Sequence, residues 1–153
     1  MILVSACLAG LRCKWNLESV EHPAVSRLFR AGLAVPACPE QLGGLSTPRE
    51  PSELRDGRVY AKGGRDVTEE YARGAEETLA IARAFGCGVA VLKSRSPSCG
   101  CGSVYDGTFT GRLVPGDGVA AALLKANGIA VYDESDADEV AAAIGVSAVA
   151  EER

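Results

Sequence analysis

Four short apolar runs recur along the chain, each bounded by glycine, proline or polar residues. They lie at residues 2–6, 33–37, 88–92 and 129–132. Runs of this length are typical of strands that are buried on both faces. Because Pro36 has no amide hydrogen to donate, the second run is expected at an edge of the sheet or at the end of a strand.

Between these runs, apolar residues repeat every three or four positions, which predicts amphipathic helices at 22–30, 66–85, 117–127 and 135–144. The clearest is the helix that Asp66 is expected to cap, with Glu69 in the capping-box position. Asp117 is the expected N-cap of the third helix. One face of the second helix carries its apolar residues, namely Val67, Tyr71, Ala75, Leu79 and Ala82.

Two stretches show neither the continuous apolar runs that predict strands nor the three-to-four-residue apolar repeat that predicts helices. Residues 39–65 are rich in proline, glycine and arginine, and are expected to form a long loop with one short strand at 58–61. Residues 93–116 are expected to form a second loop, with a small hairpin at 105–110. Long loops without regular structure in a compact domain are often functional.

Strands that alternate with helices predict a parallel sheet covered by helices on both faces. With 153 residues and no visible repeat or linker, the chain is expected to form one domain over residues 1–153. The predicted fold class is α/β: a single three-layer α/β/α domain with a mainly parallel, Rossmann-like sheet.

Charge and hydropathy narrow the functional classes. Sixteen basic and 20 acidic residues give a net charge of −4, which argues against general nucleic-acid binding. No apolar run reaches the length of a membrane span, and the first residues lack the basic start of a secretion signal. We therefore expect a cytoplasmic protein with no membrane partner; the sequence leaves its oligomeric state open.

Six cysteines in a reducing compartment favour metal or redox chemistry over a disulfide framework. Cys7 follows the first predicted strand, Cys38 the second, and Cys99 lies in the loop after the third. Since ligands of open parallel sheets bind outside the carboxyl ends of the strands, these three thiols are expected to converge.

Several groups could use such thiols. With no Cys-x-x-Cys pair and His22 as the one histidine, a Cys/His zinc finger lacks its usual ligands, but a four-cysteine zinc site stays open. Three thiolates also suit an iron–sulfur cluster with one iron left open as a Lewis acid. Buried structural thiols are the remaining alternative, and best describe Cys87. Cys13 and Cys101 fit either interpretation.

The polar loop at 93–100 is rich in small hydroxyl residues, including Ser96 and Ser98, and favours a turn whose amides face an anion or a thiolate. Lys93 and Arg95 add positive charge to it. Trp15 and Tyr105, elsewhere in the chain, could stack on a planar ligand or simply pack.

Two further charged residues are candidates for the site. Glu40, two residues after Cys38, could donate a proton or hydrogen-bond a substrate, or cap the following turn. Arg49 could pair with a carboxylate or an anionic substrate, or lie solvated in the loop.

Together these segments resemble the Domain of Unknown Function 523 family. The matching motifs are Val4-Ser-Ala-Cys-Leu-Ala-Gly10, Val35-Pro-Ala-Cys-Pro-Glu40 with Leu42-Gly-Gly-Leu45, Lys93-Ser-Arg-Ser-Pro-Ser-Cys-Gly100, Tyr105-Asp-Gly-Thr-Phe109 and Gly116-Asp-Gly-Val119. The resemblance covers about residues 2–133, and the serine–proline–serine–cysteine loop is its most specific part.

The resemblance implies a function. Some members of this family are thiouracil desulfidases, which carry a 4Fe-4S cluster on three cysteines matching Cys7, Cys38 and Cys99. Water replaces the sulfur of a small thiolated base, giving the oxo product and sulfide. The serine matching Ser96 is implicated in holding or protonating the base, with Ser98, Lys93 and Arg49 as expected substrate-binding neighbours.

Two positions depart from the family pattern. Leu42 stands where the desulfidase branch has a second glutamate, so acid–base work would fall to Glu40. Asn16 stands where many relatives have an aspartate. These departures keep a second hypothesis open, in which the protein binds or carries a cluster or sulfur, or senses redox state, without turnover. A zinc-bound or metal-free thiol domain is the third.

Overall fold

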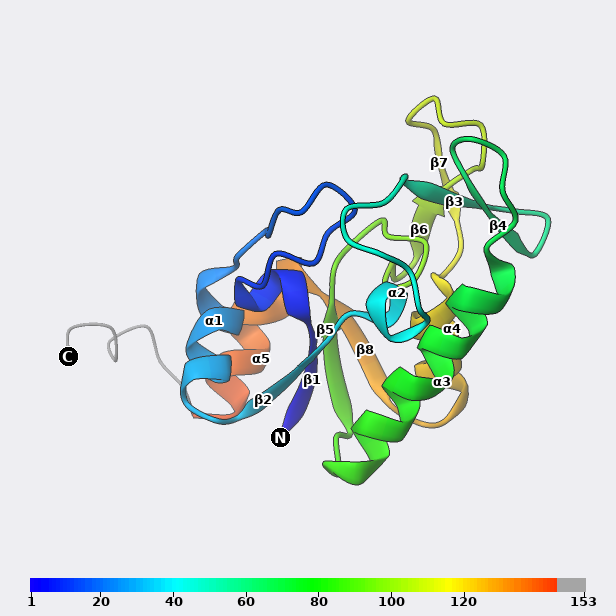
Figure 1. Cartoon of the computed structure of the whole chain (residues 1–153). Coiled ribbons are helices and arrows are strands. Elements are labelled where there is room, and N and C mark those ends of the chain that lie inside the picture. The colour runs from blue at the N-terminus through cyan, green and yellow to red at the C-terminus, as the bar shows by residue number, and fades with distance from the viewer. Residues whose placement is uncertain (146–153) are drawn as a thin grey trace.

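Four parallel strands form the central sheet, in the order β2-β1-β5-β8 (Figure 1). They are β1 (Ile2–Ser5), β2 (Ala34–Ala37), β5 (Val89–Leu92) and β8 (Ala130–Asp133). The computed structural model describes residues 1–145 of the chain. All four predicted strands are confirmed, and Pro36 lies in the edge strand β2, where no neighbour needs its amide.

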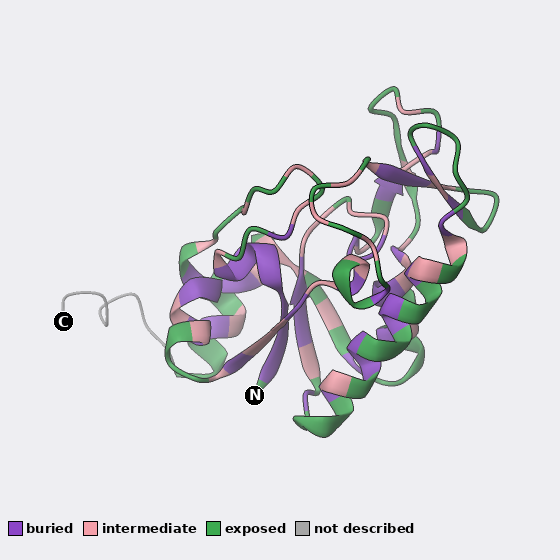
Figure 2. Ribbon diagram, viewed as in Figure 1, coloured by how far each residue is buried: buried purple, intermediate pink, exposed green. Residues whose placement is uncertain are grey.

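Helices cover both faces of this sheet. Helices α1 (Pro23–Arg30) and α5 (Ala137–Ala143) pack on one face, and α3 (Thr68–Ala84) and α4 (Val119–Ala126) on the other. Side chains alternate along β1, so Ile2 and Val4 join the first layer and Leu3 the second. Buried residues follow these contacts in Figure 2. The predicted three-layer α/β/α fold is confirmed.

The two long segments hold more regular structure than their composition predicts. Residues 39–65 contain α2 (Pro39–Leu42) and a hairpin of β3 (Ser52–Arg55) with β4 (Arg58–Ala61), of which only β4 was expected. The hairpin expected at 105–110 is wrong in its bounds, because β6 (Ser103–Tyr105) pairs with β7 (Leu113–Pro115). The carboxylate of Glu53 accepts hydrogen bonds from the amides of Gly107 and Phe109, a contact from a distant strand that fixes the turn.

Two short 3₁₀ helices complete the elements: η1 (Ala6–Ala9) follows β1, and η2 (Glu134–Asp136) follows β8. The predicted cap at Asp117 is wrong, because α4 begins after Gly118 and Asp117 instead accepts from the amide of Gly102 and pairs with Lys125. Asp66 accepts from the amide of Thr68, but the helix starts one residue later than predicted, with Val67 as its N-cap.

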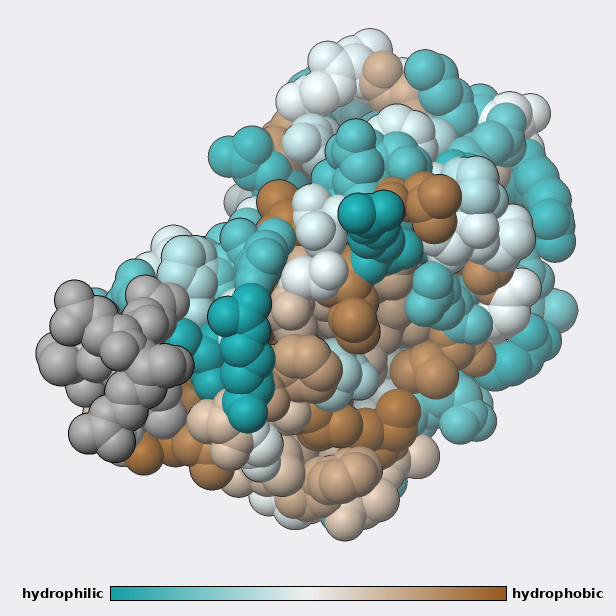
Figure 3. Space-filling model, turned by 60° about the vertical axis from the view of Figure 1, so that its left-hand side comes forward, coloured by the Kyte–Doolittle hydropathy of each residue, from teal (hydrophilic) through white to brown (hydrophobic). Residues whose placement is uncertain are grey.

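The surface divides along the direction of the strands. Figure 3 shows hydrophilic residues gathered over the upper part of one face, on the side of the hairpins, and hydrophobic residues toward the amino ends of the strands. Within residues 1–145, no helix combines the length and the apolar character of a membrane span.

Candidate active site

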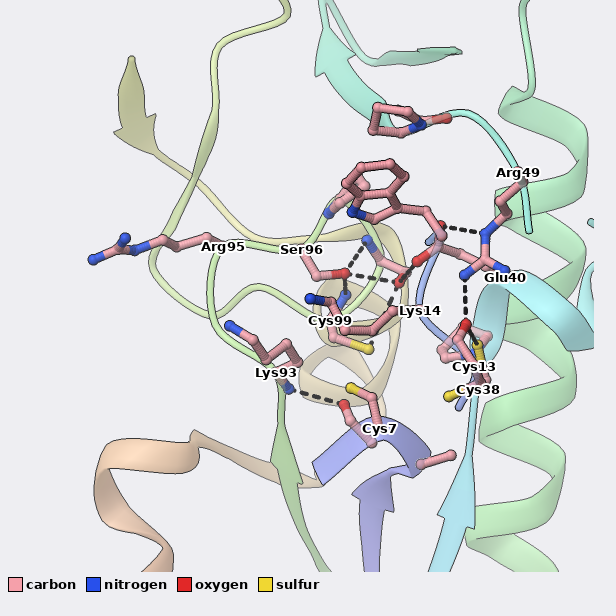
Figure 4. Close-up of a pocket in the computed structure, with 18 of the residues that line it drawn as sticks. Cys7, Cys13, Lys14, Cys38, Glu40, Arg49, Lys93, Arg95, Ser96 and Cys99 are labelled. Carbon is pink, nitrogen blue, oxygen red and sulfur yellow. Dashed lines mark hydrogen bonds and ion pairs between the residues drawn. The ribbon is translucent and has the colours of Figure 1, made fainter. Parts of the chain in front are cut away.

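A cavity of about 320 Å³ opens at the carboxyl ends of the strands, where the sheet order changes direction between β1 and β5. Three cysteines reach it from different parts of the chain (Figure 4). Cys7 lies in η1, directly after β1; Cys38 is the N-cap of α2, directly after β2; and Cys99 lies in the loop after β5. The structure thus brings together the three thiols that the sequence placed at strand ends.

Cys13 is a fourth thiol of this cavity, and the sequence left its role open. Its thiol contacts those of Cys7 and Cys38, and the Cys38 thiol also lies 3.7 Å from the Cys13 carbonyl oxygen. The segment after η1 folds back to allow this, with the amide of Val20 donating to the carbonyl of Cys7. No local pattern in residues 8–21 indicates this return.

Burial and mutual contact raise the pKa values of three thiols of this cavity, those of Cys13, Cys38 and Cys99. Burial raises the pKa of Cys99 to about 11. The contact with Cys38 lowers the pKa of Cys13, but the contact with Cys7 and burial outweigh it and raise the value to about 12. The contact with Cys13, followed by burial, also raises the pKa of Cys38. A metal centre bound here must therefore displace thiol protons.

The thiols of Cys7, Cys38 and Cys99 reach the cavity from three separate segments of the chain. Within residues 1–145, no three histidine, cysteine or acidic side chains are arranged as a lone metal ion requires. Sulfur donors from several segments around one cavity fit an iron–sulfur cluster, whose irons are bound by cysteine thiolates.

A chain of hydrogen bonds links the 93–100 loop to Glu40. The hydroxyl oxygen of Ser96 accepts from the amides of Ser98 and Cys99, at 3.2 and 3.1 Å, and lies 3.0 Å from the Ser98 hydroxyl. The Ser98 hydroxyl donates in turn to Glu40 Oε2 at 3.2 Å. Ser98 is buried, so its hydroxyl serves as the connection between Ser96 at the cavity and Glu40.

Three donors hold the Glu40 carboxylate. Besides Ser98, the phenol of Tyr71 donates to Oε1 at 2.6 Å, and Arg49 Nε donates to the same oxygen at 3.2 Å. The guanidinium of Arg49 also donates to the carbonyls of Cys13 and Ser46 and to the hydroxyl of Thr47. With a side chain only 6% exposed, Arg49 has its donors directed at the protein itself.

The two basic side chains of the 93–100 loop, Lys93 and Arg95, differ in their contacts. The Lys93 ammonium pairs with Glu134 at 3.1 Å and also donates to Ser94. Arg95, in a left-handed backbone conformation with φ of 64°, points away from the cavity in Figure 4. Lys93 and Arg95 line the cavity together with the half-buried Lys14, but the Lys93 charge is paired with Glu134 and the Arg95 side chain leads away from the thiols.

Both departures from the family pattern lie away from this cavity. Leu42 is exposed at the end of α2, and Asn16 hydrogen-bonds Glu18 in a local turn; neither lines the cavity, whereas Trp15 and Tyr105 do. The cavity wall therefore keeps its polar groups despite these two substitutions.

Gly118 holds the Cys99 loop against α4. A Cβ atom at this position would lie 2.5 Å from the carbonyl carbon of Ser98. This close approach lets the amide of Ala120 donate to the Ser98 carbonyl oxygen, at 2.9 Å. We expect Gly118→Ala to destabilise the protein by about 1–3 kcal/mol and to lower its content of any bound cluster, because the loop backbone must move.

Thermal unfolding and metal analysis measure this effect. Gly88→Ala is the matched control, since no atom lies within 4 Å of its added Cβ. An equal, small effect of both substitutions would contradict the positioning role of Gly118.

Comparison with known proteins identifies the family of this chain. A family model described as 2-thiouracil desulfurase matches residues 2–136. The chain is 43% identical over 150 residues to the uncharacterized protein YbbK of Bacillus subtilis (strain 168), covering 92% of this chain and 99% of that protein. It also superposes on the solved structure of the 4Fe-4S-dependent thiouracil desulfidase TudS (DUF523Vcz), with a TM-score of 0.87 and 41% identity, over 94% of this chain and 96% of that one. The predicted relationship to the Domain of Unknown Function 523 family is confirmed, and the chain belongs to the 2-thiouracil desulfurase family.

Proposed function

We propose that this protein is a 4Fe-4S-dependent desulfidase that removes sulfur from a small thiolated base such as thiouracil. The observation that carries the proposal is the placement of Cys7, Cys38 and Cys99 around one cavity with the Ser96–Ser98–Glu40 chain beside them. The similar TudS structure is that of a 4Fe-4S-dependent thiouracil desulfidase. In the net reaction, water replaces sulfur: a C=S bond becomes a C=O bond, and sulfide leaves without net oxidation or reduction.

Cys7, Cys38 and Cys99 would hold the cluster, which leaves one iron without a protein ligand. When bound, such a cluster supplies a Lewis acid for the sulfur of the base. The donor set fits this group because it offers three thiols from three separate segments of the chain, and Cys13 stays outside the proposed set.

Polar side chains of the protein would bind the base and transfer the protons that the reaction needs. Ser96 can hydrogen-bond the ring of the base, since its hydroxyl faces the cavity at the start of the hydrogen-bond chain. Glu40 is the one carboxylate in this series of hydrogen bonds, so it can take up or return a proton at the Ser96 oxygen through Ser98. Trp15 and Tyr105, which also line the cavity, offer aromatic surface to a planar ring.

The carrier hypothesis is not favoured by a specific feature of the site. It drew its support from Leu42, and that side chain lies outside the cavity. We therefore retain turnover as the proposed function.

The experiment that tests this function is sulfide release from 2-thiouracil and 4-thiouracil by protein purified without oxygen, with iron and acid-labile sulfide measured on the same sample. About four of each per chain, together with sulfide release, is the expected result. Cluster-loaded protein that releases no sulfide from thiopyrimidines would contradict the proposal and favour a carrier.

Glu40→Gln should lower the rate of sulfide release by about 100-fold at equal iron content. The amide keeps the size of the side chain but cannot take up a proton as the carboxylate does. Glu53→Gln is the matched control, because Glu53 lines the same cavity but binds the amides of Gly107 and Phe109. A larger loss for Glu53→Gln than for Glu40→Gln would contradict the role given to Glu40.

A further inference from the structure

Tyr71 is a buried residue of α3 that lies against the proposed site. It is 1% exposed, and its hydroxyl makes the shortest of the three hydrogen bonds to Glu40, at 2.6 Å. Burial, and then the charge of Glu40, raise the pKa of the Tyr71 phenol, so it remains a protonated donor.

The position of the Tyr71 phenol depends on a close crossing of α2 and α3. A Cβ atom at Gly74 would lie 1.8 Å from the carbonyl oxygen of Pro39, and one at Gly43 would lie 1.9 Å from that of Glu70. Only glycines allow the two backbones to approach so closely. Tyr71 precedes Gly74 by three residues and so lies on the same face of α3, directed at the segment that carries Glu40.

The ring itself is fixed by packing. Tyr71 forms a small buried cluster with Val59 and Val67, against β4 and the start of α3. The position of its hydroxyl is therefore set by rigid neighbours, whereas a free glutamate side chain rotates about three bonds. Tyr71 and Arg49 both donate to Glu40 Oε1, which leaves Oε2 facing the Ser98 hydroxyl.

We propose that Tyr71 is a positioning residue of the active site, which holds the Glu40 carboxylate in line with Ser98 and Ser96. The proposal rests on the desulfidase function proposed above. It assigns to α3 a part in the chemistry that no sequence motif of the chain indicates.

Tyr71→Phe tests this proposal because it removes only the hydroxyl. We expect kcat for sulfide release to fall about tenfold, with KM within about twofold and iron content unchanged. Thr78→Val is the matched control: Thr78 is fully buried on the same helix, and its hydroxyl bonds the Gly74 carbonyl, away from Glu40. Its kcat should stay within about twofold of wild type.

A double-mutant cycle separates positioning from general destabilisation. If Tyr71 acts through Glu40, adding Tyr71→Phe to Glu40→Gln should lower kcat by less than about twofold further. The shift in melting temperature caused by Tyr71→Phe should likewise differ between the wild-type and Glu40→Gln backgrounds, a readout that needs no turnover.

The outcomes are distinguishable. Equal kcat losses in Tyr71→Phe and Thr78→Val, or a full tenfold loss on top of Glu40→Gln, would overturn the role of Tyr71 and leave the desulfidase function standing. Cluster-loaded wild-type protein without sulfide release would overturn both.

Discussion

Replacing Cys7, Cys38 or Cys99 with alanine is expected to abolish cluster binding, the largest effect that we predict for any single substitution. Wild-type protein purified without oxygen should carry about four irons and four acid-labile sulfides per chain, and each variant less than about one. Each thiol comes from a different segment of the cavity wall, so no neighbouring residue of the same segment can replace it. Iron and sulfide analysis measure the loss, and circular dichroism verifies the fold.

Two further cysteines are controls for this experiment. Cys87 lies just before β5, at the amino ends of the strands, whereas the cavity lies at their carboxyl ends. Cys87→Ala should therefore keep its iron. Cys13→Ala is the sharper control, because Cys13 contacts both Cys7 and Cys38. Iron retained in Cys13→Ala supports the proposed three ligands; loss of iron there, with retention in one of the other three variants, would show that the ligand set is wrong.

Ser96→Ala should keep the cluster and lose turnover by about 100-fold or more. Its hydroxyl faces the cavity and is the first group of the chain that leads to Glu40, so its removal separates the substrate from the acid–base residue. The measurement is the rate of sulfide release from thiouracil, compared at equal iron content.

Two variants test whether this loss is specific. Ser94→Ala removes a hydroxyl from the same loop, but that hydroxyl bonds Glu134, so its rate should change little. Ser96→Thr keeps a hydroxyl at the position and should recover part of the rate. Because Ser96 also accepts from the amides of Ser98 and Cys99, iron lost from Ser96→Ala would point to a structural role instead, and undiminished turnover would remove its catalytic role.

Local patterns in the sequence were enough to predict the layers of this protein. The alternation and length of apolar runs are local properties, and they predicted all four strands of the sheet and all four helices that cover it, with bounds within a few residues. A parallel sheet then brings the carboxyl ends of its strands to one edge, so the positions of Cys7, Cys38 and Cys99 after strands were enough to place them together. The single-domain organisation of residues 1–153 stays a prediction.

Which side chains meet in the site depends on contacts between segments that are far apart in the chain. Glu40 and Tyr71 are 31 residues apart, and they touch because two glycines let α2 and α3 cross closely. Cys13 enters the cavity because an irregular segment folds back over η1, and its carbonyl, 36 residues away in the chain, accepts a hydrogen bond from the inward-facing Arg49. Such contacts depend on backbone crossings and side-chain packing between remote segments, which leave no periodic pattern in the chain, whereas the apolar patterns that predict strands and helices lie within a few neighbouring residues.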